Sequence, residues 1–412
     1  MNGLLVHNCS YIKSPTAKRS KRVQTLGHLV DYRYALTGQP IENKPEDLFN
    51  IMRFVDDSVL RDFVTFDRTF IVRDGYGKAV GHKNLKLLRK RMSDAMIRKT
   101  RADLKGQLPD VVENVIPIQI SSAEARLYNL IKNRLLEKMY EVMGTFGNGF
   151  DLEAHYGFSD NQSGAMTKAQ GDIATMMLAL RQVCDDARLL RLSAEHYKAR
   201  RMVTVNDKLV PDPKGKGSQF AATLLDDGHL EVLPKSTKQA ELRDLIKELI
   251  TQDTESKIVV FSFFKEELRT LQEMTSPITN SVLYTGDMNP RQKEAAKQQF
   301  KRDPKTRLFL SSDAGGYGVD LPMANYLISF DLPWSTGKFE QRESRIIRLS
   351  TEFSYVTLIA MVVRGSIEWR MYESLNEKKG VAGAYLDGGY DSKGRYKMTL
   401  SSLTQFLEVH TV

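Results

Sequence analysis

Two arginines in the segment 331-DLPWSTGKFEQRESRIIRLS-350 have a spacing that suits phosphate chemistry. Arg345 and Arg348 are three residues apart, so on a helix they project from one face. A guanidinium group stays charged and can stabilise negative charge on a transferring phosphoryl group. The same spacing is common on solvated basic helices, so the pair alone leaves both interpretations open.

A glycine-rich stretch, 311-SSDAGGYGVDL-321, follows an apolar run. Gly315, Gly316 and Gly318 allow positive φ angles and a close approach of the backbone to another chain. The simplest interpretation is a turn from a strand into a helix. A contact with a nucleic-acid backbone is compatible with such a turn.

A phosphate-binding loop of the form Gly-x-x-x-x-Gly-Lys-Ser/Thr does not occur in the sequence. Glycine–lysine pairs begin at Gly77, Gly215 and Gly337, and each is followed by a residue other than serine or threonine. Because such a loop and its lysine hold the phosphates of ATP, we do not expect this chain to hydrolyse ATP alone.

The N-terminal stretch 2-NGLLVHNC-9 is an apolar run followed by three residues whose side chains could act together in cleaving a peptide bond. The side-chain amide of Asn8 can attack its own backbone carbonyl and break the bond to Cys9. His7 can assist by proton transfer, and the Cys9 thiolate can accept an acyl group. His-Asn-Cys also occurs by chance in unrelated sequences.

Strands and helices alternate through the second half of the chain, which predicts a parallel sheet with helices on both faces. We therefore expect an α/β fold with one complete lobe at 236–390 and the C-terminal part of a second lobe at 9–115. Ser121 and Glu124 form a capping-box signature for a helix that runs to about residue 143, and another long helix is predicted at 167–192. A helical insertion and linker therefore occupy 116–235, and 391–412 is a tail.

The composition narrows the class of protein. Sixty Lys and Arg against 51 Asp and Glu give a net charge of +9, which favours a polyanionic partner. No apolar run reaches the roughly 18 residues of a membrane span, and the opening residues MNGLLVHNCS lack the basic start and long apolar stretch typical of a signal peptide. Cys9 and Cys184 are too few for a disulfide framework or a four-cysteine zinc site, and the histidines lack metal-ligand spacing. We expect a cytoplasmic protein without a membrane partner or a bound metal of its own.

Several segments, in order along the chain, resemble the motifs of Swi/Snf-type ATPases of helicase superfamily two. The segment containing Arg345 is similar to motif VI, and the glycine-rich stretch is similar to motif V. The segment 257-KIVVFSFF-264 resembles motif IV, and 34-YALTGQPIENKPEDLF-49 resembles motif III. The junction 96-MIRKTRADLKGQLPD-110 and the insertion helix 180-LRQVCDDARLL-190 also match family signatures.

The resemblance implies two RecA-like lobes, one of them partial here, that close on ATP and Mg²⁺ and step along a DNA backbone without sequence specificity. It implies arginine fingers at Arg345 and Arg348, with Gln341 a weaker catalytic candidate. The other implied contacts are to nucleotide from Gly38, Gly318 and Asp320, and to DNA from Thr37, Ser311, Ser312, Gly315 and Gly316. Ser344 and Ile347 replace the family's usual glycine and histidine, which puts the tuning of ATP turnover in doubt.

The resemblance also gives the N-terminal residues a meaning. The tail of motif II is present as 9-CSYIKSPTAKR-19, but His7 and Asn8 stand where the family has two acids. Residues 1–8 resemble the C-terminal end of an intein, with a splice junction between Asn8 and Cys9. Splicing would then join an upstream Asp-Glu to Cys9.

The hypothesis from sequence is therefore the C-terminal portion of an ATP-dependent DNA helicase or translocase. An upstream segment of the same motor would hold the phosphate loop, both acids and most contacts to ATP and Mg²⁺. The alternative is an inactive DNA-binding or scaffold relative with a degenerate motif II.

Overall fold

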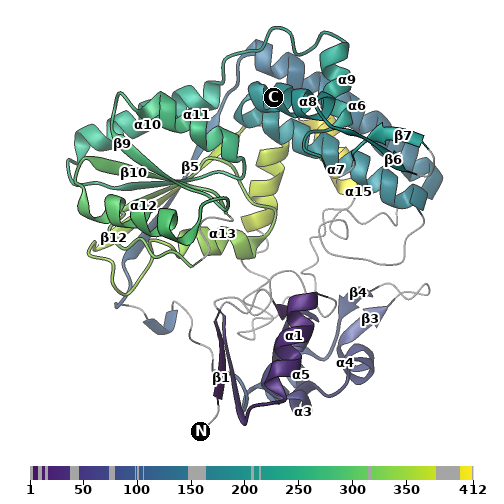
Figure 1. Cartoon of the computed structure of the whole chain (residues 1–412), viewed down its shortest axis with the longest axis vertical. Helices are drawn as coiled ribbons and strands as arrows, with labels where there is room; N and C mark the ends of the chain where they lie inside the picture. The colour runs from purple at the N-terminus through teal and green to yellow at the C-terminus, as the bar shows by residue number, and fades with distance from the viewer. Residues whose placement is uncertain are drawn as a thin grey trace. The chain divides into compact units, whose positions relative to one another are not determined.

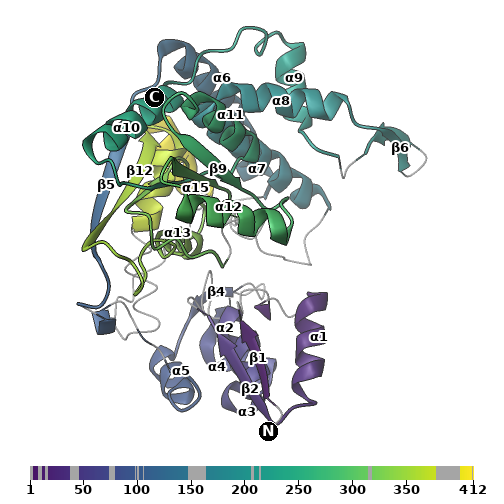
Figure 2. The ribbon, with the colours of Figure 1, turned by 60° about the vertical axis from the view of Figure 1, so that its left-hand side comes forward.

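The chain, seen here in a computed structural model, forms two compact units (Figures 1 and 2). The first contains the described residues within Met1–Leu108, Pro333–Leu349 and Leu375–Gly394, and the second those within Pro109–Leu332, Ser350–Ser374 and Arg395–Val412. The structure describes residues 3–7, 12–13, 17–37, 46–73, 79–97, 99, 102–104, 106–146, 164–205, 208–212, 215–313, 318–376, 400–410 and 412.

The second unit is built on a parallel sheet. Its strand order is β5-β12-β11-β8-β10-β9, and every pairing between neighbours is parallel. The α/β fold predicted for this half of the chain is confirmed. The strands are β5 (Asp110–Ile118), β8 (Ile258–Phe261), β9 (Asn280–Tyr284), β10 (Thr306–Ser311), β11 (Tyr326–Ser329) and β12 (Tyr355–Val363).

Helices cover both faces of this sheet. In Figure 1, α10 (Thr237–Gln252) and α11 (Lys265–Thr275) lie on one side of it and α12 (Pro290–Arg302) on the other. Every residue of β8 is buried, which explains why a short, continuous apolar run marks it in the sequence. A further helix spans residues 367–376 and follows β12.

Strand β5 joins this sheet as an edge strand. All nine of its residues pair with β12, from Asp110 opposite Tyr355 to Ile118 opposite Val363. The boundary expected between residues 115 and 116 falls inside this strand. Its outer residues are exposed, and Pro117 is tolerated because an edge strand has one side free of ladder hydrogen bonds.

The insertion is mainly helical, as its sequence predicts. Ser121 and Glu124 form the expected capping box: Oε2 of Glu124 accepts from the Ser121 N–H at 2.8 Å, and Oγ of Ser121 accepts from the Glu124 N–H at 3.3 Å. The elements here are α6 (Ser122–Phe146), α7 (Gly164–Asp185), α8 (Ala187–Lys198), the antiparallel hairpin β6 (Met202–Val205) and β7 (Lys208–Pro211), and α9 (Gln219–Asp226).

The prediction of a single helix at 167–192 is wrong, because Asp186 separates α7 from α8. This residue has an extended backbone, and its carboxylate accepts from the Arg188 N–H at 3.0 Å, which caps α8. At the C-terminus, α15 (Leu400–Val409) packs on α6, and Lys132 of α6 donates to the His410 carbonyl at 3.2 Å.

The first unit has small sheets and short helices. Its two parallel strands are β1 (Gly3–His7) and β2 (Tyr32–Leu36), and a core of Ile12, Ile51 and Phe54 packs against Ala35 of β2. The other elements are α1 (Lys18–Gly27), α2 (Glu46–Val55), α3 (Asp57–Leu60), α4 (Phe63–Phe70), β3 (Ile71–Arg73), β4 (Ala79–His82), α5 (Leu85–Met92), a 3₁₀ turn (Ala102–Leu104) and α13 (Thr336–Glu343).

A buried charge cluster ties the insertion to the sheet of the second unit. Nζ of Lys238, at the start of α10, lies 2.8 Å from Asp185 of α7 and 2.7 and 2.8 Å from the two oxygens of Glu368. All three side chains are fully buried. Burial by itself lowers the pKa of Lys238, but the two carboxylates outweigh it and raise that pKa above its usual value.

Glu267 of α11 is a second buried acid, next to this cluster. Its Oε1 accepts from Nε2 of Gln239 at 2.7 Å, while Oε2 has no hydrogen-bond partner. Burial raises the pKa of Glu267 to about 8, and the bond from Gln239 opposes this only in part. Glu267 is therefore protonated in the folded chain at neutral pH.

Replacing Lys238 with methionine should destabilise the fold strongly. The Lys238→Met variant leaves two buried carboxylates without their cation, which costs about 3–5 kcal/mol of unfolding free energy. Chemical denaturation followed by circular dichroism measures this loss. The matched control is Lys235→Met, at an exposed lysine three residues earlier, which should change stability by less than about 0.5 kcal/mol. Equal effects of the two changes would contradict a stabilising cluster.

Glu267 should make stability fall as the pH rises. Its folded pKa lies above the unfolded value of 4.5, so its contribution is full below that value and is lost on approach to pH 8. Between pH 6 and pH 8 the wild type should lose about 2 kcal/mol relative to Glu267→Gln, whose amide mimics the neutral acid. Denaturation curves at several pH values test this. Glu266→Gln, at the exposed neighbour, should follow the wild type.

Candidate functional site

Three strand ends of the second unit lie at one edge of its sheet. β11, β8 and β10 are parallel neighbours, so Asp331, Ser262 and Ser311 come at the same carboxyl ends. Oδ2 of Asp331 accepts from Oγ of Ser262 at 2.6 Å and from the Phe263 N–H at 2.7 Å. This edge is where α/β sheets bind ligands. No motif in the sequence predicts a role for Ser262 or Asp331, although each is a polar residue directly after an apolar strand.

The two serines predicted to contact DNA are held inside the second unit. Ser311 is fully buried and Ser312 nearly so. Oγ of Ser311 donates to the Tyr284 carbonyl at 3.3 Å, and the Ser312 N–H donates to the same carbonyl at 3.1 Å. These bonds fix the end of β10 against β9. Gly315 and Gly316, the other predicted contacts, lie outside the described residues, and the DNA role of all four stays a prediction.

Beyond the glycine-rich stretch, the chain alternates between exposed and buried positions. Gly318 has a φ of +72°, and in the described part of the chain no atom beyond its immediate neighbours lies within 4 Å of the point where a Cβ would stand. A glycine is therefore required here by backbone conformation and not by crowding. Val319 and Leu321 are buried, which holds the carboxylate of Asp320 on the outside. An exposed acid fixed in this way is compatible with the predicted nucleotide contact.

The helix expected to carry both arginines ends before it reaches them. α13 ends at Glu343, and Oγ of Ser344 donates to the Gln341 carbonyl at 3.1 Å. Arg345 lies in the turn that follows and Arg348 beyond it, so the two do not share a helix face, and that prediction is wrong.

Burial of hydrophobic side chains explains why the helix stops. Ile346 is fully buried and Ile347 is 5% exposed, so the chain turns inward between the arginines. The N–H groups of both isoleucines donate to the Glu343 carbonyl, at 3.3 Å each. Arg345, Arg348 and Gln341 are all half-buried.

Two predicted residues of the N-terminal part are described at the two parallel strands of the first unit: His7 is the last residue of β1, and Thr37 follows β2. β1 and β2 are parallel, with His7 opposite Leu36, so the end of β1 and Thr37, which follows β2, lie at the same edge. Thr37 is half-buried. Gly38, Asn8 and Cys9 lie outside the described residues, and their roles stay predictions.

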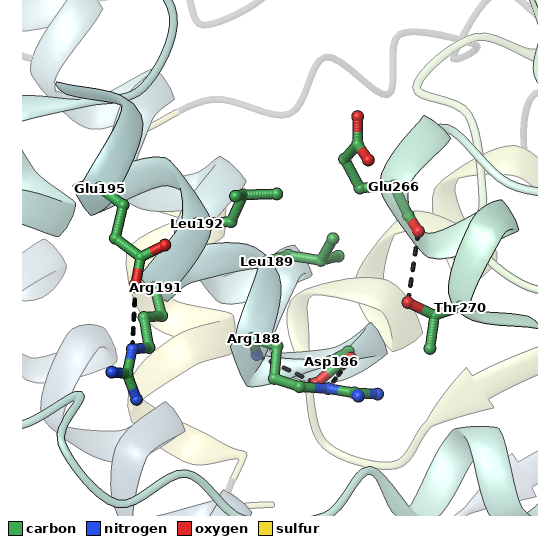
Figure 3. Close-up of a pocket in the computed structure, with 8 residues that line it drawn as sticks. All are labelled: Asp186, Arg188, Leu189, Arg191, Leu192, Glu195, Glu266 and Thr270. Carbon is green, nitrogen blue, oxygen red and sulfur yellow. Dashed lines mark hydrogen bonds and ion pairs between the residues drawn. The ribbon is translucent and has the colours of Figure 1, made fainter. Parts of the chain in front are cut away.

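A pocket of about 270 Å³ lies between α8 and α11, as Figure 3 shows. Four of its charged residues form two pairs: Nε of Arg188 lies 2.7 Å from Oδ2 of Asp186, and Nε of Arg191 lies 3.2 Å from Oε1 of Glu195. None of the residues predicted from sequence to bind nucleotide or DNA lines it. The pocket is therefore separate from the strand ends described above.

Across the part of the chain that the structure describes, no group of three or more His, Cys, Asp or Glu residues could hold a metal ion. Among the same residues, no helix has both the length and the apolar character needed to cross a bilayer.

Known proteins similar to this chain act on DNA or are described as helicases. The "Uncharacterized ATP-dependent helicase YqhH" of Bacillus subtilis is 23% identical, over 91% of this chain and 58% of its own length. DNA repair and recombination protein RAD54B of Gallus gallus is 25% identical, over 86% and 37%. Human DNA annealing helicase and endonuclease ZRANB3 is 23% identical, over 93% and 30%. The chain therefore spans between about a third and three fifths of the length of these relatives.

Among solved structures, the Sulfolobus solfataricus SWI2/SNF2 ATPase core in complex with dsDNA matches with a TM-score of 0.45 and 20% identity, over 94% of this chain and 69% of that one. Two family models match the sequence itself. The SNF2-related domain matches residues 3–189, and the helicase conserved C-terminal domain matches residues 238–350. The chain therefore resembles an SNF2-related domain in its first part and, after it, a helicase conserved C-terminal domain.

Proposed function

We propose that this chain is the C-terminal portion of an ATP-dependent DNA helicase or translocase of the Swi/Snf type. The observation that carries the proposal is the match to an SNF2-related domain followed by a match to a helicase conserved C-terminal domain, in one chain whose C-terminal half is an α/β unit with a parallel sheet. Such a motor closes two RecA-like lobes on ATP and moves along a phosphate backbone. The net charge of +9 suits that polyanion.

The proposal includes an upstream segment that completes the first lobe. β2 exposes Tyr32, Tyr34 and Leu36, each at least half accessible, on one face, whereas parallel sheets are normally covered on both faces. The chain also lacks a phosphate-binding loop. We assign this apolar face to the upstream segment of the same motor, which supplies that loop.

The described residues of this chain do not fit a Mg²⁺ site. They contain no cluster of acids and histidines that could hold a metal, and a histidine and an asparagine stand at the positions of the family's two acids. Neither side chain carries the negative charge that Mg²⁺ favours. The Mg²⁺ of this motor therefore belongs to the upstream segment.

The residues of this chain would then contact two ligands, ATP and the DNA backbone. We assign Arg345 and Arg348 to the phosphates of ATP as arginine fingers, because guanidinium groups bind phosphate oxygens well. We assign Gln341 as a further, weaker catalytic candidate. The remaining assignments are nucleotide contacts at Gly38, Gly318 and Asp320, and DNA-backbone contacts at Thr37, Ser311, Ser312, Gly315 and Gly316.

We further propose that residues 1–8 are the end of an intein. The side-chain nitrogen of Asn8 attacks its own backbone carbonyl, which breaks the bond to the nitrogen of Cys9, leaves a C-terminal succinimide and gives Cys9 a free amine. His7 supplies the proton to the departing nitrogen. The upstream segment, already held as a thioester on the Cys9 sulfur, then moves to that amine. The strand β1, which ends at His7, supports this proposal.

The alternative is an inactive relative that keeps the fold and binds DNA or partners. One observation favours it: the SNF2-related match begins at residue 3, and β1 pairs with β2 as a strand of the same lobe. In that case His7 and Asn8 are simply degenerate replacements of the two acids.

DNA-stimulated ATP hydrolysis by the full spliced product tests the main proposal. Arg345→Ala should lower kcat at least about 100-fold, because a guanidinium that stabilises phosphoryl charge is lost. Arg302→Ala, at an exposed arginine at the end of α12, is the matched control and should hydrolyse ATP normally. A full-length product that hydrolyses no ATP with or without DNA would support the inactive relative instead.

Mass spectrometry of the protein from its native source tests the splice junction. Splicing predicts a peptide in which Asp-Glu directly precedes Cys9, giving Asp-Glu-Cys-Ser-Tyr-Ile-Lys. The functional protein should contain no peptide with His7 and Asn8 joined to Cys9. Recovery of that intact peptide from active protein would overturn the intein proposal.

A further inference from the structure

Arg181 of α7 is almost completely buried, with 1% of its side chain exposed. Its guanidinium donates from Nη2 to the Leu332 carbonyl at 2.8 Å and lies 3.9 Å from Oδ1 of Asp331. It also stacks on Phe263 and Phe264, with 5.0 and 5.7 Å from Cζ to the ring centroids. These contacts are what a cation removed from water needs, and they all lie beyond the ends of two strands.

Asp331 connects the same two strand ends. It follows β11, and its other oxygen accepts from Ser262 and from the Phe263 N–H, which follow β8. The strands themselves are neighbours in the sheet, and the Phe330 N–H continues their ladder to the Phe261 carbonyl at 3.0 Å. Arg181 therefore binds a junction that is already fixed to the rigid sheet.

The chain leaves the second unit at this junction. Leu332 is the last residue of that stretch, and Pro333 begins the segment that carries α13, Arg345 and Arg348. The orientation of the Leu332 carbonyl sets the peptide plane that Pro333 shares, and Pro333 has a fixed φ. Holding that carbonyl therefore fixes the backbone at the last residue before the arginine-bearing segment.

We propose that Arg181 is a positioning residue for the arginine-bearing segment 333–349. Through it the helical insertion sets the placement of Arg345, so the insertion takes part in ATP turnover without touching ATP. This inference rests on the proposed function for its effect on turnover. Its structural part, that Arg181 restrains the backbone where the segment begins, depends only on the contacts of Arg181.

Lysine cannot replace arginine in this role. A lysine keeps the positive charge opposite Asp331, but it lacks the planar fork that stacks on Phe263 and Phe264 while donating to Leu332. Arg181→Lys should therefore fold and loosen the junction. Arg191→Lys on α8, where the arginine is half-exposed and pairs with Glu195, is the matched control.

Hydrogen exchange of this chain tests the structural part. In Arg181→Lys, amides of residues 330–349 should exchange roughly tenfold faster or more, because a hydrogen bond to a charged group no longer opposes local opening. Amides of β9 should be unchanged, as should every amide in Arg191→Lys. Faster exchange throughout the second unit would indicate a general structural role, and it would overturn the proposal, as would no change at 330–349.

A double-mutant cycle in the full spliced motor tests the functional part. Arg181→Lys should lower kcat for DNA-stimulated ATP hydrolysis roughly 10- to 100-fold with little change in KM, as expected for misplaced catalytic groups. When Arg345 is already alanine, the same change should have less than about a twofold effect. Multiplicative effects would overturn the proposal. A wild-type motor without hydrolysis would refute the proposed function, and the exchange experiment would still decide the hold on 333–349.

Discussion

A charge that is removed from water must find its partners inside the protein, and this constraint organises the second unit. Lys238 is surrounded by Asp185 and Glu368, which come from the insertion and from the helix after β12. Three segments far apart in the sequence must be correctly folded before that lysine can be buried. The cluster therefore makes the insertion and the sheet one cooperative structure, although apolar packing alone would tolerate small shifts between them.

The same constraint applies one helical turn earlier on α7. Arg181 and Asp185 are four residues apart and lie on one side of the helix. Arg181 binds the strand-end junction at Asp331 and Leu332, while Asp185 binds Lys238. Helix α7 of the insertion thus places a positively charged side chain against one part of the second unit and a negatively charged one against another. A mutation that rotates α7 disturbs both.

The sequence predicts the local elements of the second unit well and its long-range pairings poorly. Buried parallel strands such as β8 are short apolar runs, and α12 begins with a proline and a capping box at Asn289 and Gln292, so both can be read locally. The sequence does not predict the strand β5, because Asp110, Glu113, Asn114 and Pro117 interrupt its apolar residues and its partner β12 lies more than 230 residues away. The break at Asp186 is signalled only by an acid that also suits a helix surface.

For the candidate site, too, the sequence identifies local segments but not the long-range contacts between them. Motif resemblance identifies Arg345, Arg348 and the glycine-rich stretch, because those residue types recur in a fixed order. The helix end before Arg345 depends on the burial of Ile346, which is a tertiary effect. The bond between Ser262 and Asp331 joins residues 69 positions apart. No local pattern contains such a contact, so the sequence could name the segments but not the junction that they build.

The edge strand β5 also has a mechanical meaning. It is the first element of the second unit after the connection from the first, and its nine residues form a continuous parallel ladder with β12. A pull along that strand loads all of the ladder's hydrogen bonds in shear at once, whereas a pull across it would open them one after another. The β5–β12 ladder, through which the chain enters the second unit, should therefore resist tension applied along β5.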